Sequence, residues 1–152
     1  MDPESTGGAP PPHIGRAAAW LAKHVELALG EVGLSLSQYR VLGLLSEGSA
    51  ISSAVAERLA VRPPSVSAMV DGLVGRGLIE RRHNDDDRRT VSLVLTVTGH
   101  RVLADADAAV DARLADLAGC LPDEPVRREA FEGLRLWQQA MRAHRQRRLA
   151  RR

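Results

Sequence analysis

The sequence predicts a mainly helical fold that contains one β-hairpin. Alanine, leucine and arginine are the most frequent of the 152 residues, and aromatic residues make up only 3%. Because β-branched residues are sparse outside two short stretches, helix is the expected state of most of the chain. Hydrophobic residues at 44% and charged residues at 26% are typical of a globular protein that buries a core. At this length we expect one compact unit.

Arginine supplies nearly all of the positive charge, since the net charge is +2 and Lys23 is the single lysine. Arginine suits bidentate binding of phosphate and guanine, although codon bias in a GC-rich genome explains most of the count. Cys120 is the single cysteine, which excludes an intramolecular disulfide and fits a reducing compartment. Its place between Gly119 and Leu121 favours a role as a small apolar filler over a redox switch. No apolar run approaches the roughly 20 residues that span a bilayer, and no signal-peptide pattern is present. We therefore expect a cytoplasmic protein without a membrane partner.

The N-terminal part of the chain divides into an arm and two helices. Residues 1–12 (MDPESTGGAPPP) are rich in glycine, proline and small polar residues, which predicts a flexible arm. Apolar residues then recur at steps of three and four over Ile14–Val32, which predicts one helix that Gly33 ends. Ser35 and Gln38 have capping-box spacing and predict the start of a second, short helix.

Two further helices follow, separated by a tight turn. Ser52 or Ser53 can cap a third helix over residues 54–60. Arg62-Pro63-Pro64 comes directly after it, and proline is accepted only in the first turn of a helix, so a fourth helix should start at about Pro64 and run to Gly75. A short helix, a tight turn and a helix with a small, polar exposed face are typical of a helix-turn-helix.

A charged hairpin comes next. Residues 78–82 and 90–95 are the two convincing strand candidates, and residues 83–89 between them are all polar. Helix, turn, helix and charged hairpin in this order predict a winged helix-turn-helix. A helix about 10 Å in diameter fits the major groove of DNA, while the hairpin reaches the flanking minor groove.

The C-terminal part is expected to form two long helices. Thr96 or Thr98 can cap the first, whose apolar seam runs from Val102 to Leu117. Residues 121–125 (LPDEP) break it, and the final helix ends in an arginine-rich tail.

At the hairpin the sequence resembles the MarR family of bacterial regulators. Asp87-Arg88-Arg89 followed by Leu95-Thr96-Val97-Thr98-Gly99 resembles the family's Asp-x-Arg and Leu-Thr-x-x-Gly at the usual spacing. These two motif fragments follow the segment Leu73-Val74-Gly75-Arg76-Gly77-Leu78-Ile79. Each fragment alone is unspecific, but the spaced pair is a specific signal. The resemblance covers roughly Ile14 to Met141.

The resemblance implies a role for each residue of the wing. Arg89 would enter the minor groove, Asp87 would hold it in position, and Arg88 would lie on or near the backbone. A narrow minor groove concentrates negative potential and attracts a guanidinium. The alternative is a solvated charged turn. Asp85, Asp86 and Asp87 could also hold a divalent cation, but the ligand spacing of a calcium loop is absent, so we prefer salt bridges within the wing and expect no metal.

The resemblance also assigns the groove-facing positions of the fourth helix, which are Arg62, Pro63, Ser65, Ser67 and Ala68. Serine hydroxyls in the first turn can bind phosphate or a base edge, aided by the helix dipole. The alternative for Ser65 is a capping role alone. Ala68 departs from the longer polar or basic residue of many relatives, which shifts specificity towards the wing and DNA shape.

Family members dimerise through their outer helices. We therefore expect residues 13–34 and 97–152 to form a helical dimerisation region and residues 35–96 to form the DNA-binding lobe. A two-fold homodimer predicts a pseudo-palindromic operator on double-stranded DNA. The alternative is that the apolar stripes close a monomeric core.

Relatives commonly release DNA when a small molecule binds between the dimerisation region and the lobe. Trp20, His24 and Tyr39 are candidates for such a pocket, the alternative being core or dimer-interface roles. No cofactor or enzyme activity is expected, because the histidines are dispersed and phosphate loops and nucleophile motifs are absent. A repressor is the leading hypothesis. A ligand- or protein-binding dimer with little sequence-specific DNA binding is the alternative.

Overall fold

The computed structural model describes residues 13–59, 62–83 and 91–150, so the predicted arm at residues 1–12 lies outside the described residues. The fold is mainly helical with one small sheet, as predicted. The elements in chain order are α1 (Ile14–Glu31), α2 (Leu36–Ser46), β1 (Ala50–Ile51), α3 (Ser52–Leu59), α4 (Pro63–Gly75), β2 (Ile79–His83), β3 (Val91–Leu95), α5 (Val97–Ala118) and α6 (Glu124–Ala150). None of the described helices is long and apolar enough to cross a membrane.

The sheet is antiparallel and has the strand order β1-β3-β2. β2 and β3 form the predicted hairpin, in which Ile79 lies opposite Leu95 and Arg81 opposite Leu93. β1 was not predicted, because two residues are too short to show the alternation of a strand. It pairs Ala50 with Leu93 and so places the start of α3 beside the hairpin.

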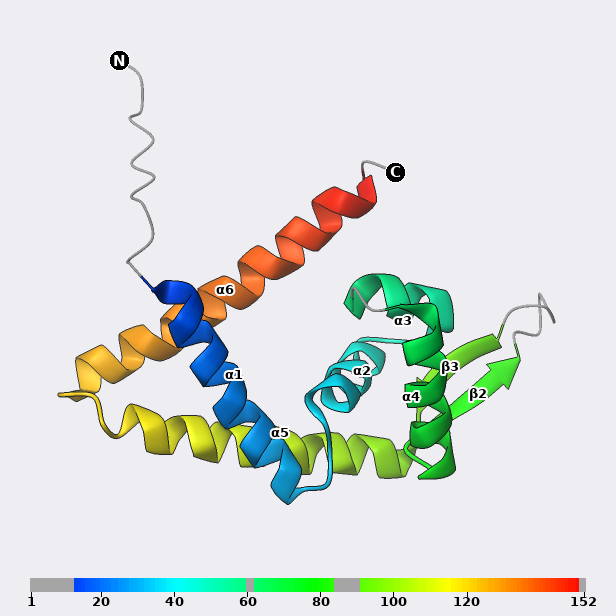
Figure 1. Ribbon diagram of the computed structural model, residues 1–152, viewed down its shortest axis with the longest axis horizontal. Helices are drawn as coiled ribbons and strands as arrows, with labels where there is room; N and C mark the ends of the chain where they lie inside the picture. The colour runs from blue at the N-terminus through cyan, green and yellow to red at the C-terminus, as the bar shows by residue number, and fades with distance from the viewer. Residues whose placement is uncertain (1–12, 60–61, 84–90, 151–152) are drawn as a thin grey trace, which may run out of the picture.

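Helices α1, α2, α3, α4 and α5 and the sheet all contribute side chains to one hydrophobic core. Its largest fully buried side chains are Leu29, Leu42, Leu73, Ile79, Leu93, Val41, Val55, Val66 and Val70. In Figure 1, α5 runs along the base of the molecule and connects the lobe formed by α2, α3, α4 and the sheet to the opposite end. α1 and α2 both pack on α5. The long helix therefore fixes the lobe to the outer helices.

Local capping explains where the helices begin. The Gln38 amide donates to Ser35 Oγ at 3.2 Å and the Ser35 amide donates to Gln38 Oε1 at 3.0 Å, which confirms the capping box. The prediction that Ser52 or Ser53 precedes and caps a helix at residue 54 is wrong. Both serines lie in the first turn of α3, because the helix follows β1 without a gap.

The turn at residues 119–123 joins α5 to α6, and the two helices diverge from it (Figure 1). Cys120 lies exposed in this turn, so the expectation that it fills an apolar space is wrong. The turn is at the end of the molecule where the two helices separate, which leaves the thiol uncovered.

Candidate nucleic-acid interface

Arg62 and Pro63 determine where α4 begins. Arg62 is the N-cap of α4, with extended backbone angles of φ −70° and ψ 141°, and Pro63 is the first helical residue. Proline suits this position because the first amides of a helix have no carbonyl to pair with. The amides of Ser65 and Val66 donate to the Arg62 carbonyl at 3.0 and 3.2 Å. The helix therefore begins one residue earlier than predicted.

Four of the five predicted groove-facing positions are exposed, and the side chain of the fifth, Pro63, lies outside the described part of the chain. Val66 and Val70 are buried in the core, as predicted. Ser65, Ser67 and Ala68 are exposed, as is Arg62 at the helix start. Successive positions on a helix alternate between faces with a period of 3.6 residues, so packing one face on the core necessarily presents the other.

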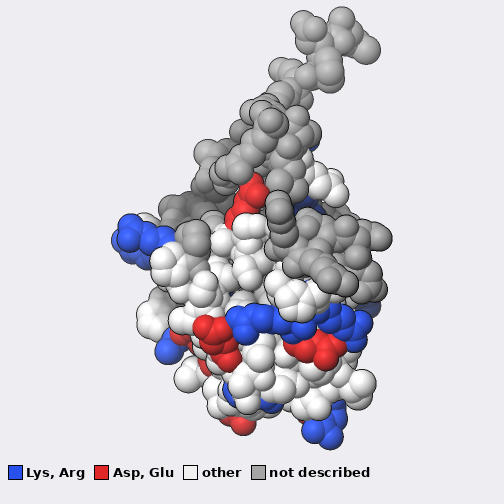
Figure 2. Space-filling model, turned by 90° about the vertical axis from the view of Figure 1, so that its right-hand side faces the viewer, with Lys and Arg blue, Asp and Glu red and all other residues white. Residues whose placement is uncertain are grey.

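The hairpin beside α4 carries two ion pairs, of which one joins it to that helix. Arg81 Nη2 lies 2.5 Å from Asp71 Oδ1 of α4, and Arg82 Nη2 lies 2.5 Å from Glu80 Oε1 on the same strand. Figure 2 views the molecule from this side and shows basic and acidic side chains lying against one another across the face. The charges of this surface are therefore paired near the base of the wing.

The tip of the hairpin, residues 84–90, lies outside the described residues. Asp87, Arg88 and Arg89 belong to it, and their proposed roles stay predictions. Asp85 and Asp86 lie in the same segment. Within the part of the chain that the structure does describe, no group of three or more His, Cys, Asp or Glu side chains could hold a metal ion.

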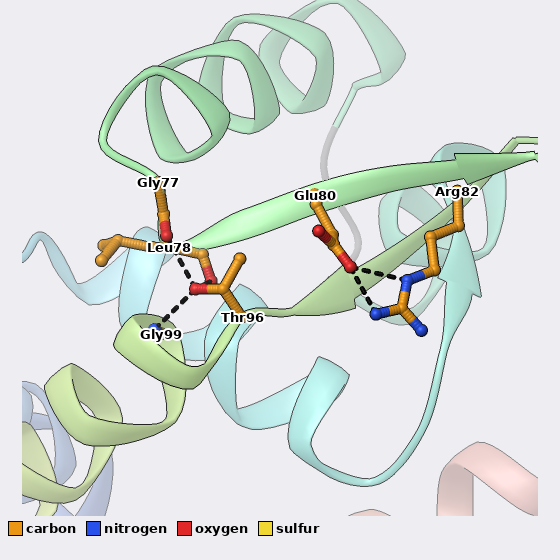
Figure 3. Close-up of polar contacts among 6 residues, drawn as sticks. All are labelled: Gly77, Leu78, Glu80, Arg82, Thr96 and Gly99. Carbon is orange, nitrogen blue, oxygen red and sulfur yellow. Dashed lines mark hydrogen bonds and ion pairs between the residues drawn. The ribbon is translucent and has the colours of Figure 1, made fainter.

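The base of the wing is locked to α5 by Thr96. Its hydroxyl donates to the Gly77 carbonyl at 2.7 Å and accepts from the Gly99 amide at 2.9 Å (Figure 3). The Thr96 amide also donates to the Leu78 carbonyl at 3.1 Å. One residue therefore caps α5 and holds the exit of α4, which explains physically why Thr96 and Gly99 recur together in the motif.

The structure gives the three effector candidates different surroundings. Trp20 is 71% exposed, so a core role for it is wrong. His24 Nδ1 accepts a bond from Arg113 Nε of α5 at 3.3 Å. Tyr39 Oη donates to Asp107 Oδ1 of α5 at 2.6 Å. Burial, and then the bond to Asp107, raise the pKa of the Tyr39 phenol well above its ordinary value.

Of the three, Tyr39 alone lines a cavity of about 720 Å³ between α2, α3, α5 and α6. The arginine, histidine and acidic residues of the cavity wall are Arg40, Arg58, Arg142, His144, Arg145, Glu47, Glu57 and Asp107. Glu47 Oε1 lies 3.4 Å from Arg142 Nη2, which links the end of α2 to α6. Sequence reasoning missed this wall, because its members come from four separate helices.

Sequence reasoning also missed the ion pair between Asp71 and Arg81. Asp71 stands off the buried stripe of α4, and this was the available signal that it needs a surface partner. The partner sits ten positions later on a strand. Pairing between a helix and a strand follows no fixed spacing, so the sequence alone does not predict it.

These elements define a winged helix-turn-helix protein of the DNA-binding class. The MarR family model matches residues 32–90. The HTH-type transcriptional repressor MdtR of Bacillus subtilis is 35% identical over 109 residues, which cover 71% of this chain and 70% of MdtR. The chain belongs to the MarR family of transcriptional regulators. MarR regulators are DNA-binding proteins and not enzymes, in agreement with the sequence analysis.

Two solved structures illustrate the similarity. The repressor CouR bound to a 23-mer DNA duplex is 29% identical, with a TM-score of 0.67, and the match covers 82% of this chain and 89% of that one. CouR from Rhodococcus jostii RHA1 bound to p-coumaroyl-CoA is 30% identical, with a TM-score of 0.63, and the match covers 80% of this chain and 85% of that one.

Proposed function

We propose that the protein is a homodimeric repressor that binds a pseudo-palindromic operator and leaves it when a small molecule binds. The observation that carries this proposal is the surface formed by α4 and the hairpin. Ser65, Ser67 and Ala68 are exposed on the helix that follows the tight turn, and the charged strands of the wing lie beside it. A helix and a hairpin in this arrangement can occupy adjacent grooves of one duplex.

The relatives support repression as the mode of regulation. MdtR is named a repressor, and CouR is a repressor whose structure contains a DNA duplex. In the proposal, Arg89 inserts into the minor groove, Asp87 orients it and Arg88 binds the backbone. Ser65 and Ser67 bind phosphate or base edges near the start of α4, where the helix dipole is positive. The protein would act in the cytoplasm, where a bacterial operator is found.

Exposed apolar side chains on the outer helices support a dimer. On α6 the large ones are Val126, Phe131, Leu134, Leu136, Trp137 and Met141, and on α1 they are Ile14, Trp20 and Leu27. A concentration of exposed apolar side chains on such helices is typical of a protein interface. Residues 13–34 and 97–152 would thus form the dimerisation region and residues 35–96 the lobe. Two copies related by a two-fold axis would present two α4 helices about one turn of DNA apart.

The cavity that Tyr39 lines is the proposed effector site. Its volume of about 720 Å³ lies within the roughly 300–1,000 Å³ range of small-molecule sites. It also lies between α2 and α3 of the lobe and the outer helices α5 and α6, so a ligand there could change the angle between them. The structure of CouR with p-coumaroyl-CoA supports a small molecule as the class of effector.

The test begins with selection of the operator from a pool of random duplexes by the full chain. Arg89→Ala should lower affinity for the selected duplex by about tenfold to a hundredfold, because an inserted guanidinium loses its place in the groove. Arg128→Ala is the matched control, since Arg128 is an exposed arginine on α6. Binding by the parent should also weaken steeply between low and physiological salt, because phosphate contacts release counterions.

The alternative, a dimer with little sequence-specific DNA binding, predicts different results. Selection would enrich no sequence, and Arg89→Ala would match Arg128→Ala. Either result would overturn the proposed function. Enrichment of an inverted repeat together with a specific loss in Arg89→Ala would exclude the alternative.

A further inference from the structure

Asp71 is the single charged residue of α4, the helix proposed to enter the major groove. It lies one turn after Ser67 and Ala68, on the side away from the core. A carboxylate in this place would be repelled by DNA phosphates. The Arg81 guanidinium at 2.5 Å from Asp71 Oδ1 neutralises it.

Arg81 comes from a particular face of the hairpin. In the β2–β3 register, Ile79 lies opposite Leu95 and Arg81 lies opposite Leu93, so these residues point to the same face of the sheet. Ile79 and Leu93 are buried on that face. Arg81 therefore extends from the core-facing side, at the edge of the core, to meet α4.

Glu80 and Arg82 belong to the opposite face of the hairpin and pair with each other (Figure 3). Their ion pair has the same length, 2.5 Å, and is also exposed. It lies within one strand, however, and ties no second element to it. The two pairs thus share their chemistry and differ in what they connect.

The Asp71–Arg81 pair closes a segment of the chain that contains the end of α4, the turn at Gly77 and the start of β2. This segment determines the direction in which the hairpin leaves the helix. Exposed ion pairs contribute little to folding stability, so the pair is not required to hold the lobe together. Its effect would appear when α4 and the wing must bind one duplex at the same time.

We propose that Asp71 and Arg81 form a positioning pair that sets the wing relative to α4 and thereby determines operator specificity. The proposal rests on the proposed function, in which α4 and the wing tip contact DNA together. Without the pair, Arg81 is free to bind any phosphate and the wing is no longer aligned with the helix. The affinity for unrelated DNA then rises, while the affinity for the operator falls or stays unchanged.

The test compares Asp71→Asn with Glu80→Gln in the full chain. Each substitution removes one negative charge and breaks one exposed carboxylate–arginine pair in the lobe. Affinities are measured for the selected operator and for a scrambled duplex. Asp71→Asn should lower the ratio of the two affinities by about tenfold, within the range of couplings between contacting residues, and Glu80→Gln should leave the ratio near that of the parent.

A charge exchange provides the second arm. Asp71→Arg and Arg81→Asp should each lower the ratio, and the doubly substituted protein should regain most of it, because the pair is restored with its charges reversed. Equal ratios for Asp71→Asn and Glu80→Gln, or no recovery in the double variant, would overturn the proposal.

The two hypotheses fail in different ways. If the parent selects an operator and Arg89→Ala weakens its binding, but Asp71→Asn leaves the ratio unchanged, only the positioning pair is refuted. If the parent selects no operator, the proposed function is refuted and the positioning pair with it.

Discussion

Gly99 lies so close to Leu78 that a Cβ atom on Gly99 would stand 1.9 Å from the Leu78 carbonyl oxygen. Two non-bonded atoms cannot approach to that distance, so only glycine fits where the first turn of α5 crosses the exit of α4. Thr96 completes the contact by donating to the Gly77 carbonyl from the other side. The Leu-Thr-x-x-Gly pattern is therefore a joint between the DNA-binding lobe and the long helix.

Gly99→Ala should lower the free energy of unfolding by about 3 kcal/mol, because the backbone of Leu78 or of α5 must move to make room. Urea denaturation at one protein concentration measures this. Gly72→Ala is the control, since nothing lies within 4 Å of a Cβ there and the residue is helical. It should be neutral or stabilising by about 0.5–1 kcal/mol. Similar stabilities for the two variants would contradict the contact.

Tyr39 should make stability fall above pH 10. Its pKa is raised above the ordinary 10.0, first by burial and then by the bond to Asp107. Below pH 10 the folded and unfolded chains both hold the phenolic proton, and above it the unfolded chain releases the proton first, so unfolding becomes more favourable as pH rises. In Tyr39→Phe this fall should be shallower by up to about 1.4 kcal/mol per pH unit. The free energy of unfolding is measured by urea denaturation between pH 9 and pH 11. An equal fall with pH in the parent and in Tyr39→Phe would refute the prediction.

Trp137→Glu should dissociate the proposed dimer. Trp137 is 64% exposed in the single chain and stands within the apolar residues of α6. A carboxylate buried there without a partner would raise the dimer dissociation constant about a hundredfold or more. Sedimentation equilibrium measures the change. Gln139→Glu adds the same charge two residues along, on another face of the helix, and should leave the dimer intact. Equal dissociation of both variants would argue against this interface.

Mild peroxide should leave operator binding unchanged, because Cys120 lies at the end of α5 remote from α4 (Figure 1). The thiol is exposed and can react, but the length of α5 separates its turn from the helix-turn-helix (Figure 1). Fluorescence anisotropy with the operator, before and after peroxide, measures this. A loss of binding in the parent that Cys120→Ser abolishes would show that the cysteine is a redox switch after all.

The order and type of the long elements were predictable because their signals are local. The spacing of apolar residues over Ile14–Val32 predicted α1, and Ser35 with Gln38 predicted the capped start of α2. The same holds for the hairpin, whose strands differ in composition from the segment between them. Each of these signals depends on residues within one or two turns of one another, so no knowledge of the chain path is needed.

The residues of the candidate site were predictable only where they belong to a single helix. Ser65, Ser67 and Ala68 share the exposed side of α4 because helical periodicity places them there. The effector candidates show the opposite case. Trp20 was a candidate because it lies one turn from His24, and Tyr39 because it starts the second helix. The structure leaves Trp20 on the surface and gives Tyr39 a partner 68 positions away.

By itself the sequence determined the long helices, the caps of α2 and α5, the hairpin and the family motif, because short-range hydrogen bonds and apolar periodicity specify them. Only the tertiary structure decided which distant side chains meet. It brought Asp107 to Tyr39 and Arg81 to Asp71, added β1 to the edge of the sheet and set the Leu78 carbonyl against Gly99. These contacts depend on how the whole core packs, since packing directs the path of the chain between elements that share no local signal.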